Sequence, residues 1–312
     1  MNRATATAAA TVCALQFIAS AAPQDQTIRR RVTGVRIDAV VTAGGRPVTG
    51  LRAEDFDVRD NDVPQRIESF SLADGLSLGV VLDLSHSVQE GREEIYHHWR
   101  KGREGAAELL DAARSAVGAL RDADESLLVT FTGAVELTTD VGKGGALVLN
   151  ALNNPQWVQT RASKSLSRVW DAVFAAGGLV SGAPQRPVVM LFSDGIDNAS
   201  WVSGDEMSRS LDTLGVTLDV ITEPRTYDTD DWVPPESWKF NGFVERTGGI
   251  TVSARGAKAT EKLRARIEQL RQGYVLTFVP TGVKTGDGWH RLTVSVRKQS
   301  VRVEARQQYL AK

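Results

Sequence analysis

The chain has 312 residues, of which 42% are hydrophobic and 24% charged, and its formal net charge is −1. These values are ordinary for a soluble globular protein, and the near-neutral charge argues against a nucleic-acid binder, which would present a basic surface. The length is too great for one small domain. The one long basic run, residues 29–31, is more typical of a solvated strand edge than of a binding patch.

The first 21 residues have the pattern of an export signal. Arg3 supplies the positive start, residues 8–18 an apolar core too short to span a bilayer, and 19–21 a small-residue cleavage site. The alternative is a disordered alanine-rich leader. We therefore expect an exported protein, periplasmic or extracellular, with no transmembrane segment in its mature chain. The single cysteine, Cys13, lies in this leader, so the mature chain has no disulfide and no catalytic thiol.

Short runs of β-forming residues separated by turn signals occur near both ends of the chain, in 32–75 and 274–312. Neither segment is long enough to bury a core alone. We therefore expect both to meet in one small β-sandwich with the rest of the chain inserted between them, because the termini of a domain are often close in space. The alternative is that strand 274–279 remains the last strand of the inserted domain, because it directly follows a predicted helix.

Residues 76–273 alternate strand and helix patterns, which predicts an α/β fold with a doubly wound, mostly parallel sheet covered by helices on both faces. The expected strands are 78–84, 127–131, 136–138, 188–192, 216–221 and 250–252. The expected helices are 105–120, 166–175, 205–214 (with Gly215 as its cap) and 259–272.

The first strand of this region ends in one carboxylate and two hydroxyls at alternating positions, Asp83, Ser85 and Ser87. A second polar group, which contains Asp194, follows the strand 188–192. Because ligands of open α/β sheets bind outside the carboxyl ends of the strands, we expect these side chains to meet at one point. Hard oxygen ligands of this kind suit Mg²⁺, Mn²⁺ or Ca²⁺. The alternative is a set of turn and cap residues without a metal.

These motifs resemble the metal-ion-dependent adhesion site of von Willebrand factor type A domains. The flanking sequences are similar to those of the von Willebrand A-related proteins abundant in acidobacterial genomes, and the resemblance covers nearly all of the mature chain. It implies a von Willebrand A-like fold and a divalent cation, but no known ligand. The residues that carry it are Asp83-x-Ser85-x-Ser87, Ser193 to Ser200, Asp55-Phe56, Val58, Asp60-Asn61, Gln272 to Leu276, Pro280, Val303 to Arg306 and Tyr309.

The resemblance also implies roles for the site residues. The hydroxyls of Ser85 and Ser87 would bind the metal directly, and Asp83 and Asp194 would act largely through water molecules. Three neutral hydroxyls would leave the metal electrophilic, so it would attract a carboxylate from a partner protein.

The third hydroxyl comes, in the family, from a threonine in the loop before the third helix. Here Ser167 stands in that place and keeps the hydroxyl, but the Gly-Gly pair of the family is replaced by Ser165-Leu166. Ser165 and Thr160 are alternative ligands. For Ser167 itself, the alternative is that it only caps the following helix.

Other residues at the same edge of the sheet are candidates for contact with a partner. His86 lies between the two serines and would point to solvent beside the metal. The expected loop 223–240 carries Trp232 and Trp238, and exposed aromatic residues on loops often mark interfaces. The same tryptophans would also fit a small local core under a long loop.

The sequence therefore predicts an exported protein-binding module without enzymatic activity, which captures a partner carboxylate through a divalent metal. One alternative is a structural A-type domain whose metal site is vestigial. Another is a metal-dependent hydrolase with Asp83 or Asp194 as base, but no acid–base pair lies near a nucleophile motif.

Overall fold

The computed structural model describes residues 34–85, 88, 103–154, 166–222, 235–284, 288–298 and 300–311. The predicted signal segment 1–21 lies outside these ranges. Within them, every helix is too short or too polar to cross a membrane.

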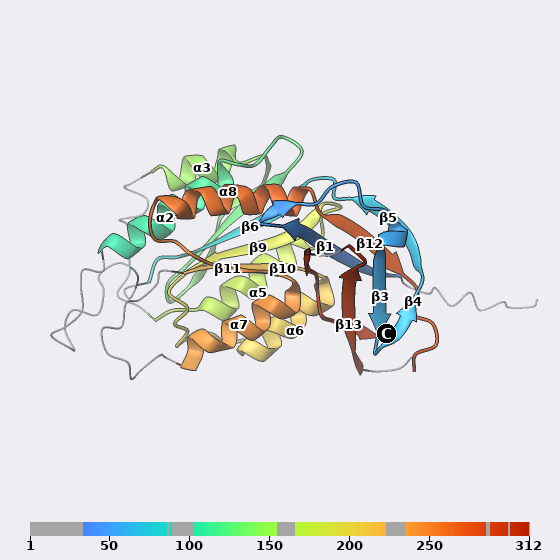
Figure 1. Ribbon diagram of the computed structural model, residues 1–312. Coiled ribbons are helices and arrows are strands. Elements are labelled where there is room, and N and C mark those ends of the chain that lie inside the picture. Colours follow the sequence, from blue (N-terminus) through green and yellow to red (C-terminus); the bar gives the residue numbers. More distant parts are fainter. Residues whose placement is uncertain are drawn as a thin grey trace, which may run out of the picture. The chain divides into compact units, whose positions relative to one another are not determined.

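A six-stranded mixed sheet forms the centre of the α/β part (Figure 1). Its strands lie in the order β11-β10-β9-β6-β7-β8, and β8 alone runs antiparallel to its neighbour. The chain builds the sheet outward from β6 to β8 and then crosses to β9 on the other side, as in doubly wound folds. The bounds are β6 Leu76–Asp83, β7 Glu125–Phe131, β8 Val135–Lys143, β9 Arg186–Phe192, β10 Thr217–Thr222 and β11 Thr251–Ser253.

Helices cover both faces of this sheet, so its central strands are mostly apolar. Every residue of β6 and of β9 is buried. Helices α2, α3 and α8 pack on one face and α5, α6 and α7 on the other (Figure 1). The bounds are α2 Arg103–Val117, α3 Ala146–Leu152, α5 Val169–Val180, α6 Gly204–Leu214, α7 Pro235–Thr247 and α8 Ala257–Arg271.

The α/β fold predicted from the sequence is confirmed, and each strand and helix expected between residues 76 and 273 is present with somewhat different ends. Helices α3 and α7 were not predicted. The expectation of a loop over 223–240 is wrong in its last part, because α7 begins at Pro235. A proline fits the first helical position, where its missing N–H would have no partner, and Phe240 and Phe243 then face the core.

Two further sheets take strands from both ends of the described chain. One has the order β14-β1-β12-β5, with β2 paired to β1, and the other has the order β15-β13-β3-β4. Their bounds are β1 Val35–Ala43, β2 Arg46–Pro47, β3 Phe56–Asp60, β4 Val63–Gln65, β5 Ile67–Leu72, β12 Tyr274–Phe278, β13 Gly288–Val296, β14 Arg302–Glu304 and β15 Gln308–Ala311; a 3-10 turn covers Ala53–Asp55.

Pairing between distant segments builds these sheets. Ile37 of β1 lies opposite Leu276 of β12, and Val58 of β3 lies opposite Val294 of β13. Strand β12 pairs with β1 and β5, so it is not the last strand of the six-stranded sheet. Both sheets contribute to one hydrophobic cluster, in which Tyr274 packs edge-on against Phe56.

A buried polar triad connects three neighbouring strands of the second sheet. The Asp60 carboxylate accepts a hydrogen bond from the Tyr309 hydroxyl at 2.6 Å and lies 2.8 Å from Nδ1 of His290. Burial, the hydrogen bond to Asp60 and the charge of that carboxylate all raise the pKa of Tyr309. The triad satisfies polar groups that would otherwise be costly to bury, so it fixes β15 and β3 on β13.

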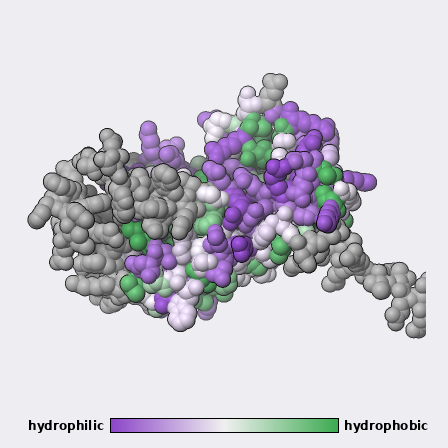
Figure 2. Space-filling view, turned by 90° about the horizontal axis from the view of Figure 1, so that it is seen from below, coloured by the Kyte–Doolittle hydropathy of each residue, from purple (hydrophilic) through white to green (hydrophobic). Residues whose placement is uncertain are grey.

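Hydrophilic residues cover most of the described surface on the face in Figure 2, and hydrophobic residues gather there only in small groups. The most exposed large apolar side chain among the described residues is Trp201, on the loop between β9 and α6. Scattered apolar residues of this kind are normal on a soluble surface and need no special explanation.

Removal of residues 1–75 should make the remaining chain aggregate, because β1 and β5 cover both edges of β12 and β3 pairs with β13. Size-exclusion chromatography with light scattering would measure this. A monodisperse, cooperatively folded 76–312 fragment would contradict the pairing.

Candidate metal site

The carboxyl end of β6 places Asp83 at the base of the candidate site. Asp83 is the last residue of the strand and is 1% exposed. Its Oδ1 accepts the backbone N–H of Ser85 at 2.8 Å, and its Oδ2 accepts the Ser193 hydroxyl at 2.6 Å. These bonds join the loop after β6 to the loop after the neighbouring strand β9, so the two strand ends meet as the sequence predicted.

The loop after β9 turns sharply at Gly195. The Ser193 hydroxyl accepts the N–H of Gly195 at 2.9 Å, and Asp194 accepts the N–H of Ile196 at 3.0 Å. Gly195 has a φ of +79°, and a Cβ there would lie 3.1 Å from the Phe240 ring. The positive φ favours glycine at this position, and any side chain there would also have to displace the Phe240 ring slightly. The turn directs the chain from β9 toward α5.

Asp83 is strongly perturbed electrostatically. Burial raises the pKa of its carboxyl to about 7, and the negative charge of Asp194 adds to that rise, while hydrogen bonds from Ser193 and Ser85 oppose it. The nearby negative charge thus adds to burial in disfavouring the charged form of Asp83. A bound cation would reverse this effect, because it would neutralise both charges.

The segment before α5 is attached to the loop after β9. Ser167 donates its N–H to Oδ1 of Asn198 at 2.8 Å, and its carbonyl accepts the N–H groups of Asn198 and Ala199, each at 3.1 Å. Asp197 accepts the first helical N–H groups of α5, those of Val169 at 2.8 Å and Trp170 at 3.3 Å. Ser167 is therefore held beside the loop that carries Asp194.

The hydroxyl of Ser167 is buried and has no hydrogen-bond partner among the described residues. Ser167 also does not cap α5, because the N-cap position is Arg168 and Asp197 accepts the helix amides instead. A buried hydroxyl without a partner costs free energy, so it calls for an explanation such as a bound ion or water.

The described side chains suit a hard divalent cation. Two carboxylates and two buried hydroxyls, those of Asp83, Asp194, Ser85 and Ser167, come from three loops at the same edge of the sheet. Mg²⁺ and Mn²⁺ prefer such oxygen ligands and keep water in their remaining positions. The described part of the chain has no cluster of three or more histidine, cysteine, aspartate or glutamate residues, so a cation here would depend on the hydroxyls.

The remaining predicted residues lie where the structure gives no side chain. Ser87, His86 and Trp232 fall outside the described residues, as do the alternative ligands Ser165 and Thr160. Trp238 lies in α7 rather than in a loop, and its side chain is not described.

Sequence reasoning did not assign roles to three residues that build the site: Ser193, Asp197 and Asn198. All three lie in the Ser193–Ser200 stretch that carried the resemblance. The sequence held a partial signal for them: Arg168, at the N-cap of α5, cannot accept the helix amides, and an aspartate or asparagine commonly does so. The residues that accept the amides here are about thirty positions further along the chain, beyond the reach of local capping rules.

Distant similarities to solved structures include von Willebrand A domain proteins, as the sequence resemblance predicted. A von Willebrand factor type A protein from Catenulispora acidiphila has a TM-score of 0.48 at 12% identity, over 90% of this chain and 74% of that one. The BatB protein of Bacteroides thetaiotaomicron has a TM-score of 0.46 at 15% identity, over 63% and 98%. Manganese-loaded TRAP protein of Plasmodium vivax has a TM-score of 0.43 at 13% identity, over 81% and 98%.

No protein-family model matches the sequence, and no curated protein is similar to it. At TM-scores below 0.5 the structural similarities assign neither ligand nor partner, and the fold assignment rests on the strand order itself.

The pKa of Asp83 predicts how the stability of the metal-free protein depends on pH. A pKa raised from 3.8 to about 7 means that the folded state binds the proton more tightly than the unfolded state. The contribution of this group to stability is therefore greatest below about pH 4 and is lost as the pH rises through about 7. Each pH unit within this interval corresponds to at most about 1.4 kcal/mol.

The measurement is denaturant unfolding with a chelator present, at about pH 5 and about pH 7.5. The unfolding free energy of the wild type should fall between these pH values by more than that of Asp83→Asn, which cannot ionise. Equal pH dependence of the two proteins would contradict the raised pKa.

Proposed function

We propose that this chain is an exported protein-binding module that captures a carboxylate of a partner protein through a divalent cation. Asp83, Ser85, Ser87, Ser167 and Asp194 would hold the cation, preferably Mg²⁺ and otherwise Mn²⁺ or Ca²⁺. The observation that carries the proposal is the buried hydroxyl of Ser167, which has no partner in the described part of the chain, at the edge where two carboxylates repel each other.

The donor set supports binding of an external anion. The hydroxyls add no charge and the two carboxylates would act largely through water molecules, so a metal held this way would remain electrophilic. A partner carboxylate is a hard oxygen ligand and would complete the coordination. His86, Trp232 and Trp238, which follow the same strand ends in the sequence, would contact the partner around the metal.

Two alternatives predict different behaviour. A structural domain with a vestigial metal site would leave Ser167 without a partner and show no response to metal. A hydrolase would need a nucleophile and a base that a substrate can reach, whereas Ser193, whose hydroxyl bonds the Asp83 carboxylate, is 0% exposed. The binding module therefore fits the described contacts best.

We further propose that the strands from 32–75 and 274–312 form one β-sandwich that carries the α/β domain. The shared hydrophobic cluster of their two sheets supports this. The proposed export signal at residues 1–21 would place the mature protein in the periplasm or outside the cell.

Millimolar Mg²⁺ or Mn²⁺ should raise the melting temperature of the protein, because a ligand that binds only the folded state stabilises it, by about 2.7 kcal/mol at a hundred times the dissociation constant. Differential scanning fluorimetry with and without metal measures the gain. Asp83→Ala should abolish the gain, and Asp140→Ala, at an exposed position of β8, should retain it. A wild-type melting curve that is unchanged by metal would refute the site.

Ser167→Ala should weaken metal binding about tenfold or more through loss of one ligand, whereas Ser167→Thr should preserve it. Threonine offers the same hydroxyl and a stiffer χ1 angle. Titration calorimetry with Mn²⁺ would compare both variants with Ser165→Ala and Thr160→Ala. If Ser167→Ala binds like the wild type while one of the other two fails, the third hydroxyl comes from that residue instead.

A further inference from the structure

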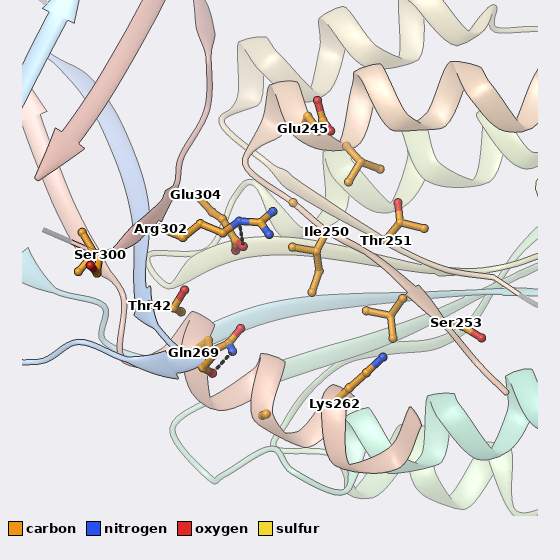
Figure 3. Close-up of a pocket in the computed structure, with 17 residues that line it drawn as sticks. Thr42, Glu245, Ile250, Thr251, Ser253, Lys262, Gln269, Ser300, Arg302 and Glu304 are labelled. Atoms are coloured by element: carbon orange, nitrogen blue, oxygen red, sulfur yellow. Dashed lines mark hydrogen bonds and ion pairs between the residues drawn. The ribbon is translucent and has the colours of Figure 1, made fainter. Parts of the chain in front are cut away.

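A cavity of about 920 Å³ lies where the edge of the six-stranded sheet faces the edge of a flanking sheet (Figure 3). One side is β11, an edge strand of the six-stranded sheet. The other side is β14, an edge strand of the β14-β1-β12-β5 sheet. Helices α7 and α8 and the Gly44–Gly45 turn complete the walls. Its volume lies within the range of ligand sites in proteins.

The cavity exposes backbone groups of β11. Val220 of β10 donates to the carbonyl of Ile250, and Ala254 donates to the carbonyl of Thr222, each at 2.9 Å. Because alternate residues of a strand direct their backbone groups to opposite sides, Thr251 and Ser253 direct theirs away from β10. No hydrogen bond from any described residue reaches the main-chain N–H or C=O of these two residues.

The walls of the cavity are held firmly. Glu304 of β14 binds Arg302 at 3.1 Å and also binds Arg266 of α8 at 2.5 Å. Gln269 of α8 donates to the carbonyl of Gly45 at 2.8 Å. A Cβ on Gly249 would lie 1.9 Å from the carbonyl oxygen of Leu218, so the chain entering β11 packs directly on β10. The two strand edges therefore keep a fixed separation.

Lys262 supplies a positive charge that has no ion-pair partner among the described residues, and the other carboxylate of the lining besides Glu304, that of Glu245, lies on α7 and away from Lys262 in Figure 3. In Figure 3 Lys262 projects from α8 toward β11. Its side chain is exposed, and no described carboxylate lies within ion-pair distance of it. Arg302, by contrast, is already paired with Glu304.

We propose that this cavity binds an extended peptide segment of a partner protein, which adds as a strand to the outer edge of β11 and places an acidic side chain near Lys262. The free N–H and C=O groups at Thr251 and Ser253 recur at the two-residue repeat of a strand, about 6.6 Å, which another strand matches. Strand β11 has only three residues, so the added segment would be short. This site is separate from the proposed metal site and does not depend on it.

The test uses the full chain and a fluorescein-labelled peptide of sequence Thr-Val-Thr-Glu-Thr-Val-Thr, followed by fluorescence anisotropy. Saturable binding is expected. The same peptide with alternate backbone amides N-methylated keeps its side chains but loses donors on one edge, so one of the two methylation registers should bind about tenfold more weakly or not at all. Equal binding of both registers and of the parent peptide would overturn strand addition.

Thr251→Pro tests the edge from the protein side. The N–H that it removes points away from β10, so proline leaves the ladder with β10 intact. The variant should keep the wild-type circular dichroism spectrum and lose peptide affinity about tenfold. Wild-type affinity in the folded variant would overturn the proposal.

Lys262→Glu tests the charge, and it remains informative if Thr251→Pro does not fold. It should weaken binding of the glutamate peptide and strengthen binding of a peptide with lysine at the same place. Arg264→Glu makes the same change of charge at a residue of α8 that does not line the cavity, and should have a smaller effect on both peptides. Equal effects of the two substitutions would mean that the charge attraction between protein and peptide is nonspecific, and would overturn the role of Lys262.

Hydrogen exchange locates the contact and identifies other occupants. The amides of Thr251 and Ser253 should exchange fast in the free chain and slow down when the peptide is bound. Slow exchange in the free protein at monomeric dilution would mean that the chain itself covers this edge, and slow exchange only at high concentration would mean that a second copy does. Either result would overturn a partner peptide as the occupant.

Discussion

The Arg266 guanidinium joins the six-stranded sheet to the flanking sheet that contains β14. It projects from α8, is 1% exposed, and binds Asp219 of β10 through two hydrogen bonds of 2.8 and 2.9 Å. Its third contact is Glu304 of β14 at 2.5 Å. Burial alone would lower the pKa of Arg266, but the charges and hydrogen bonds of Asp219 and Glu304 outweigh it and raise that pKa. An arginine is suited to this place, because its planar group binds a carboxylate with two nitrogens at once.

This ion pair explains why the flanking sheets and the six-stranded sheet hold one arrangement. Removing one partner of a buried pair leaves an uncompensated charge and costs about 3–5 kcal/mol, even where the intact pair adds little net stability. A second buried arginine, Arg186 at the start of β9, reaches the carbonyls of Asp38 in β1 and Leu270 in α8. Burial lowers its pKa to about 10, while Asp38 opposes the shift. If the flanking sheets packed differently on the six-stranded sheet, Arg266 or Arg186 would be buried without its partners.

Local sequence patterns predicted the α/β part of the fold because its strands and helices carry clear signals of their type and of their ends. Strands β6 and β9 are buried on both faces and appear in the sequence as short apolar runs, and Gly215 at a φ of +70° ends α6 where the sequence placed a cap. Helix α7 was missed because two consecutive prolines in the sequence, the second of which begins the helix, indicated a loop, and its aromatic residues showed no clear helical period. Pairing of β1 with β12 joins residues more than two hundred positions apart. The sequence indicated that the two end segments meet only because neither is long enough to bury a hydrophobic core alone.

In the candidate site, too, some residues are positioned by the local sequence and others by residues distant in the chain. The positions of Asp83, Ser85 and Asp194 follow from where two neighbouring parallel strands end, and this local pattern is visible in the sequence. The position of Ser167 follows from Asn198 and Asp197, whose side chains bind backbone groups of the loop before α5. These aspartate and asparagine side chains already accept the hydrogen bonds of the amides there. The Ser167 hydroxyl is therefore not needed to cap the helix, and it has no partner among the described residues. A buried hydroxyl without a partner among the described residues, beside two carboxylates that repel each other, is an arrangement that a divalent cation would stabilise.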